Sequence, residues 1–98
     1  MLKIIYNLMK RVSITIMGKV IGVFFRAHVR DLAKDLKIKG YVQNTPDDCL
    51  LIVAEGEEKA IERLIDFCKK GPEGAVVENV KVKKEGFKNE FEDFLIEY

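Results

Sequence analysis

The sequence has few of the residues that mark metal sites, redox pairs and disulfide frameworks. It contains two cysteines, Cys49 and Cys68, and one histidine, His28. The cysteine spacing matches neither a zinc motif nor a C-x-x-C pair, so we expect two free thiols, one in a strand and one on the apolar face of a helix. His28 follows Arg26 by two positions on a predicted helix, so the two side chains point to different sides and we expect a solvated histidine.

An excess of charge of one sign is also missing. The chain carries 17 basic and 16 acidic residues, which gives a formal net charge of +1. A general nucleic-acid-binding protein usually has a strong basic excess, so we expect no nucleic-acid partner. A small anionic ligand needs only one local positive site, and near-neutrality does not count against it.

The sequence has no apolar run close to the roughly 20 residues that span a bilayer. The mildly apolar start, Met1 to Met9, is too short for a signal sequence with its flanks and has no small-residue cleavage site. We therefore expect a cytoplasmic protein with no membrane partner.

What the sequence does contain is the pattern of one small domain. Its 98 residues, 48% of them apolar, are enough for one compact core. We expect residues 10–98 to form this domain and residues 1–9 to form an N-terminal extension. Within the domain, Val12 to Met17 alternate between apolar and other residues, which predicts a strand that ends at Gly18.

The rest of the chain alternates between helical and strand patterns. A helical stripe begins near Phe25, strands are predicted at 41–44 and 49–55, and a second helix opens after Gly56. The stripes of the two helices consist of Phe25, Val29, Leu32 and Leu36, and of Ile61, Leu64, Ile65 and Cys68. A fourth strand at 75–84 shifts its apolar phase between Val77 and Val80, which predicts a bulge.

A short alternating segment, Phe94 to Tyr98, predicts a terminal strand. The order β-α-β-β-α-β predicts an α+β ferredoxin-like sandwich, with two helices on one face of an antiparallel sheet. Leu51 and Val53 would then face away from the helices, where a cover is needed. We consider the N-terminal extension or a second subunit as this cover. A monomer is expected, with a dimer through the outer sheet face as the alternative.

The loop from Gly18 to Arg26 joins the first strand to the first helix. Its glycines permit positive φ, and its end coincides with a helix N-terminus, where backbone N–H groups lack intrahelical acceptors. Such groups can converge on an anion, and Arg26 adds a planar fork of donors suited to phosphate oxygens. A plain strand–helix turn with a surface arginine has the same spacing, so this pattern alone leaves both readings open.

Two ordered motifs make a more specific case. Residues 18–26, GKVIGVFFR, resemble the acylphosphatase signature G-x-V-Q-G-V-x-F-R at every specified position except Ile21, where the family has Gln. Residues 40–44, GYVQN, resemble its G-[aromatic]-V-x-N element, and Leu50 and Gly56 fall at the family's spacing. The resemblance covers about Val12 to the C-terminus. A further departure is Asp48, which replaces the glycine usual in the hairpin turn.

The resemblance implies an enzyme that hydrolyses the carboxyl–phosphate bond of a small acyl phosphate and releases inorganic phosphate. By position, Arg26 binds the phosphoryl oxygens and Asn44 orients the attacking water. The phosphate is cradled by the backbone of Val20, Ile21, Gly22, Val23 and Phe24. No cofactor or metal is implied, and the adjacent Asp47 and Asp48 are interpreted as turn residues.

The alternative is a non-catalytic ligand- or protein-binding module on the same fold, because this fold serves many functions. An RNA-binding version would want exposed aromatic residues on central strands, whereas the first strand offers Ser13, Thr15 and Met17.

Overall fold

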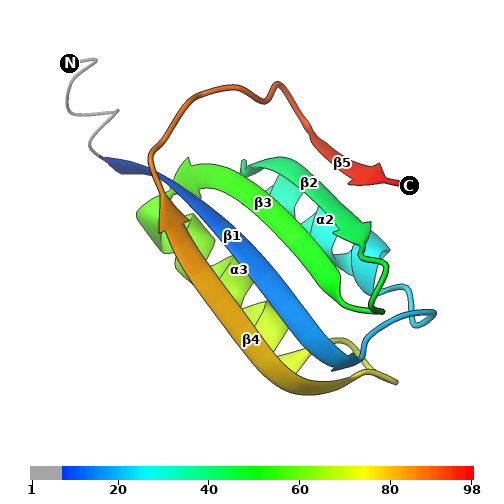
Figure 1. The fold of residues 1–98 in the computed structure, drawn as a ribbon. Coiled ribbons are helices and arrows are strands. Elements are labelled where there is room, and N and C mark those ends of the chain that lie inside the picture. Colours follow the sequence, from blue (N-terminus) through cyan, green and yellow to red (C-terminus); the bar gives the residue numbers. More distant parts are fainter. Residues whose placement is uncertain (1–7) are drawn as a thin grey trace.

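The computed structural model describes residues 8–98 and has the predicted order of elements (Figure 1). The elements are β1 (Met9–Lys19), α2 (Phe25–Asp35), β2 (Lys39–Asn44), β3 (Leu50–Glu57), α3 (Glu58–Lys70), β4 (Val76–Glu85) and β5 (Phe94–Glu97). Both helices cover the same face of one five-stranded sheet, which confirms the predicted α+β ferredoxin-like sandwich. Within the described residues, neither helix is long and apolar enough to cross a membrane.

The strands lie in the order β4-β1-β3-β2-β5. The first four are antiparallel to their neighbours, as predicted, but β5 pairs with β2 in parallel, with Val42 opposite Ile96. The parallel pairing arises because residues 86–93 carry the chain from the β4 edge to the opposite edge before β5 begins (Figure 1).

The core lies between the sheet and the two helices. Its members come from the predicted stripes and from alternate strand positions, and they include Val12, Ile14, Ile16, Val29, Leu50, Ile52, Ala54, Ile61, Leu64 and Cys68. Burial raises the pKa of the Cys68 thiol to about 12, so this cysteine is an inert core residue. Cys49 is a free, half-buried thiol immediately before β3 rather than within the predicted strand.

The predicted bulge in the fourth strand is present. Met17 pairs with Asn79 and Gly18 pairs with Val77, so Glu78 is the extra residue on β4. Gly18 therefore lies inside β1 rather than at its end. At its φ of 132° a Cβ atom would lie 2.1 Å from the carbonyl oxygen of Val76, which explains why the position requires glycine.

The turn at the end of α2 places a residue other than glycine in the left-handed conformation. Lys37, with φ of 59°, takes the left-handed position, whereas Gly40 lies within β2. A Cβ atom on Gly40 would lie 1.8 Å from the carbonyl oxygen of Val53, so this glycine lets two strands approach rather than ending the helix.

The outer face of the sheet is covered at one end by the connection between β4 and β5. The ring of Phe91 packs edge-on against Tyr41 at 5.9 Å and lies 5.2 Å from the Arg11 guanidinium carbon. Tyr41 is the register partner of Val53, which is only 6% exposed. The connection between β4 and β5 thus covers part of the outer face, which was not predicted, and the first seven residues of the expected extension lie outside the described part of the chain.

This connection is held by the buried carboxylate of Glu55. The carboxylate accepts hydrogen bonds from three successive backbone N–H groups, those of Lys88 at 2.7 Å, Asn89 at 3.0 Å and Glu90 at 3.1 Å. Three converging N–H groups form a nest for an anion, here supplied by the protein itself. Because Glu55 is 3% exposed, these bonds replace water that the carboxylate has lost on folding.

Arg11 completes the cluster from the neighbouring strand. It forms ion pairs with Glu90 at 2.6 Å, Glu85 at 3.0 Å and Glu55 at 3.5 Å. Desolvation alone would lower the pKa of this buried arginine, but its hydrogen bonds to these carboxylates outweigh that effect and raise the pKa. The guanidinium therefore stays charged and joins β1, β3, the end of β4 and the crossing connection.

We predict that Glu55→Gln lowers the free energy of unfolding by about 2–4 kcal/mol, because the amide NH2 would face backbone donors inside the protein. Urea denaturation measures this loss, and limited proteolysis should show faster cleavage within residues 86–93. Glu57→Gln is the matched control, since Glu57 is exposed on the same strand. An equal effect of the two substitutions would contradict the assigned role of Glu55.

Candidate active site

The loop between β1 and α2 has two left-handed residues. Gly22 has φ of 77° and Phe24, the N-cap of α2, has φ of 57°. Val20 anchors the start of the loop in the core, whereas the side chains of Ile21 and Phe24 are exposed, by 39% and 80%. Left-handed residues alternating with right-handed ones turn successive N–H groups toward one side. The backbone, rather than the side chains, is therefore what this loop presents.

The N–H groups of the loop are open. In the described part of the chain, His28 is the first residue after β1 whose N–H donates to a protein carbonyl, and its acceptor is Phe24 at 3.1 Å. The side chain of the N-cap residue forms no hydrogen bond with the backbone of the helix. The loop and the first turn of α2 thus combine unpaired donors with the positive end of the helix dipole. Both features favour an anion at this place.

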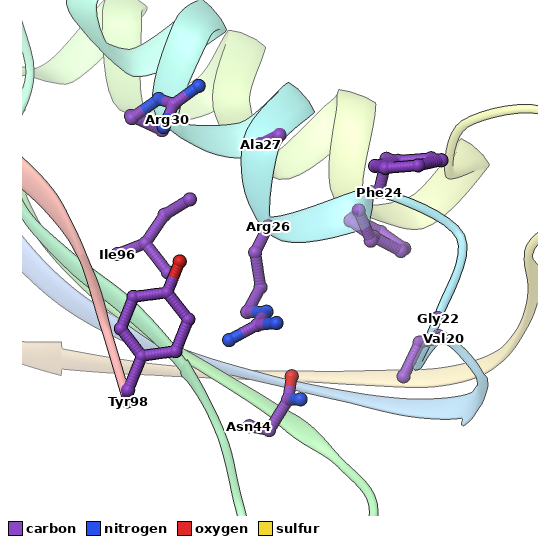
Figure 2. Close-up of a pocket in the computed structure, with 10 residues that line it drawn as sticks. Val20, Gly22, Phe24, Arg26, Ala27, Arg30, Asn44, Ile96 and Tyr98 are labelled. Atoms are coloured by element: carbon purple, nitrogen blue, oxygen red, sulfur yellow. The ribbon is translucent and has the colours of Figure 1, made fainter.

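Arg26 and Asn44 reach the same place from different elements. Arg26 lies in the first turn of α2, and its side chain extends from the helix toward Asn44 (Figure 2). Asn44 ends β2 on the face that carries Val42, beyond the point where the helices cover the sheet, and it is exposed. The guanidinium carbon of Arg26 lies 5.1 Å from the centre of the Tyr98 ring. The ring therefore borders the arginine on the β5 side by a cation–π contact.

These residues border a cavity of about 380 Å³, shown in Figure 2. It is lined by Val20, Gly22, Phe24, Phe25, Arg26, Ala27, Arg30, Asn44, Ile96 and Tyr98. Of the predicted site residues, Ile21 and Val23 do not line it. The lining has two cations, Arg26 and Arg30, and no acidic side chain, so its charge suits an anion.

The wall made by Ile96 and Tyr98 was not predicted from the sequence. Their alternation was visible, but the parallel pairing that sets β5 beside β2 was not. Arg30 was also missed, although its spacing of four residues from Arg26 places both on one face of a helix. His28, in contrast, is exposed as predicted. No group of three or more potential metal-ligating side chains occurs among residues 8–98.

The fold and the cavity define a small α+β sandwich with a pocket lined by two arginines at the start of its first helix. Comparison with known proteins extends this description. The family model Acylphosphatase matches residues 12–96. The chain is 44% identical to an acylphosphatase of Syntrophus aciditrophicus, over 93% of this chain and 95% of the relative. It is 46% identical to an acylphosphatase of Thermotoga petrophila, over 92% and 99% of the two chains.

Solved structures agree with the sequence comparison. The structure of an acylphosphatase from Coxiella burnetii superposes with a TM-score of 0.87 at 33% identity, covering 93% of this chain and 95% of that one. The chain belongs to the acylphosphatase family, and it is an enzyme of that family.

Gly18 in β1 and Gly22 in the following loop should differ in their tolerance of a side chain. Gly18→Ala should cost about 3 kcal/mol of stability, because the Cβ meets backbone at a φ that alanine disfavours. Gly22→Ala should cost about 1 kcal/mol, since a Cβ there meets nothing within 4 Å and only the left-handed φ is unfavourable. Urea denaturation of both variants tests the difference. Equal losses would mean that the bulge does not constrain Gly18.

Proposed function

We propose that the chain hydrolyses the carboxyl–phosphate bond of small acyl phosphates, releasing a carboxylate and inorganic phosphate. One observation carries the proposal: Arg26 and Asn44 come from different elements and line one cavity beside a loop with open N–H groups. This is the arrangement that phosphoryl transfer to water needs, in which the phosphoryl group is held on one side and the nucleophile is positioned on another.

The phosphoryl group would be bound by two kinds of donor. The backbone N–H groups of residues 20–24 would donate hydrogen bonds to some of its oxygens, and the guanidinium of Arg26 would donate two parallel bonds to the others. The loop donors are set by the backbone, and the Arg26 guanidinium lies beside the Tyr98 ring, so both sets are in place before the substrate arrives. They would therefore stabilise the charge that spreads over the equatorial oxygens in the transition state without further reorganisation.

Asn44 would orient the attacking water. Its amide offers both an acceptor and donors, so it can fix a water molecule without being ionised. The water oxygen attacks phosphorus, and the electron pair of the breaking P–O bond leaves on the carboxylate. One proton of the water stays on the phosphate product and the other passes to solvent. Because a carboxylate is a good leaving group, with an ordinary pKa of about 4, no general acid is required.

The activity test uses release of phosphate from benzoyl phosphate. The wild type should be active. Arg26→Ala should lower kcat/KM by about 10²–10³-fold, because it removes charged donors from the phosphoryl oxygens. Asn44→Ala should lower kcat by about 10²-fold with little change in KM, since it acts on the water rather than on binding.

Matched controls separate these effects from general damage. Arg63→Ala removes an exposed arginine of α3 that does not line the cavity, and Gln43→Ala removes the neighbour of Asn44 that lies on the outer sheet face. Both should keep wild-type rates. An inactive, folded wild type would favour the non-catalytic alternative. Wild-type activity in Arg26→Ala and Asn44→Ala would refute the roles of these two residues but not the proposed activity.

Ile21 stands where family members have glutamine, and its side chain does not line the cavity. We therefore predict that Ile21→Gln changes kcat/KM for benzoyl phosphate by less than about threefold, or under about 0.7 kcal/mol. The backbone donors of the loop do not depend on this side chain. A tenfold or larger gain would show instead that an amide at this position contacts the substrate.

A further inference from the structure

Arg30 is the second cation of the cavity, and the function proposed above does not use it. It lies four residues after Arg26 on α2 and lines the same cavity (Figure 2). At a rise of about 1.5 Å per residue, the two arginines are about 6 Å apart along the helix axis. A ligand whose phosphoryl group is bound at Arg26 would therefore extend along the cavity toward Arg30.

The wall between the two arginines is mostly apolar. Ala27 on the helix and Ile96 and Tyr98 on the β5 side line this part of the cavity. Such a wall suits the hydrocarbon part of an acyl group. Beyond it, Arg30 offers a positive charge in a lining that contains no acidic side chain. The order of features along the cavity is thus cation, apolar wall, cation.

Arg30 keeps donors free for a ligand. Its Nε donates to Asp31 Oδ1 at 3.0 Å. A guanidinium has five N–H donors, so this single bond leaves the two terminal nitrogens available. The pair contributes little to stability, because the two side chains are 38% and 67% exposed.

We propose that Arg30 binds an anionic group on the acyl part of the substrate, so that the enzyme prefers acyl phosphates that carry a second negative charge. The proposal rests on the function proposed above and specifies its substrate class. Arg30 is here a specificity-determining residue: it acts on binding of the acyl group and not on the bond that breaks.

Two substrates of equal size test this preference. 4-Carboxybenzoyl phosphate carries a para-carboxylate that cannot cyclise onto the acyl phosphate, and 4-carbamoylbenzoyl phosphate is its neutral counterpart. For the wild type, kcat/KM should be about fivefold higher for the carboxylate, mainly through KM, as expected for one partly exposed charged hydrogen bond. Raising ionic strength from about 0.05 M to about 0.5 M should reduce this ratio.

Arg30→Gln should bring the ratio between the two substrates close to one, and Arg30→Lys should keep part of it because the charge remains. Arg63→Gln, which removes an exposed arginine outside the cavity, should leave the ratio at the wild-type value. An unchanged ratio in Arg30→Gln, or no preference in the wild type, would overturn the inference. Failure of the wild type to hydrolyse benzoyl phosphate would instead refute the proposed function itself, and this inference with it.

Discussion

The hydrogen bonds of the buried Glu55 carboxylate are the interaction on which the connection between β4 and β5 depends. Its three bonds to backbone N–H groups, with Arg11 beside it, hold the connection that crosses from one edge of the sheet to the other. A buried charge is costly unless it is fully paired, so the connection has one favourable path. That path decides where β5 starts and in which direction it runs.

The cavity is assembled from three elements that differ in how they are fixed. Arg26 is placed by α2, whose apolar stripe is buried in the core, and Asn44 by a strand paired on both sides. Ile96 and Tyr98 depend on β5, which pairs only with β2. The side of the cavity formed by α2 and β2 is therefore built on the core, whereas the side formed by β5 depends on the crossing connection.

Local patterns predicted most of the fold. The helices, the four main strands and the bulge opposite Gly18 follow from periodicity and glycine positions, because each depends on neighbours in the sequence. The two motifs that contain Arg26 and Asn44 could be recognised for the same reason, since each is a short local segment. The role of Glu55 was not, since its partners Lys88, Asn89 and Glu90 are more than 30 residues away and nothing nearby distinguishes it among 16 acidic residues. The parallel pairing of β5 with β2, which places Tyr98 in the wall of the cavity, could not be predicted either, because the two strands are also far apart in the sequence.

The position of β5 at the sheet edge also bears on local unfolding. The strand has four residues, contributes the buried Phe94 and the partly buried Ile96 to the core, and pairs with a strand more than 50 residues earlier in the chain. Pairings of such long range form late in folding and open early in native-state fluctuations. Opening of β5 would remove one wall of the cavity while the core and the loop stay intact. Access of larger acyl groups would then be governed by a local equilibrium rather than by the static shape of the pocket.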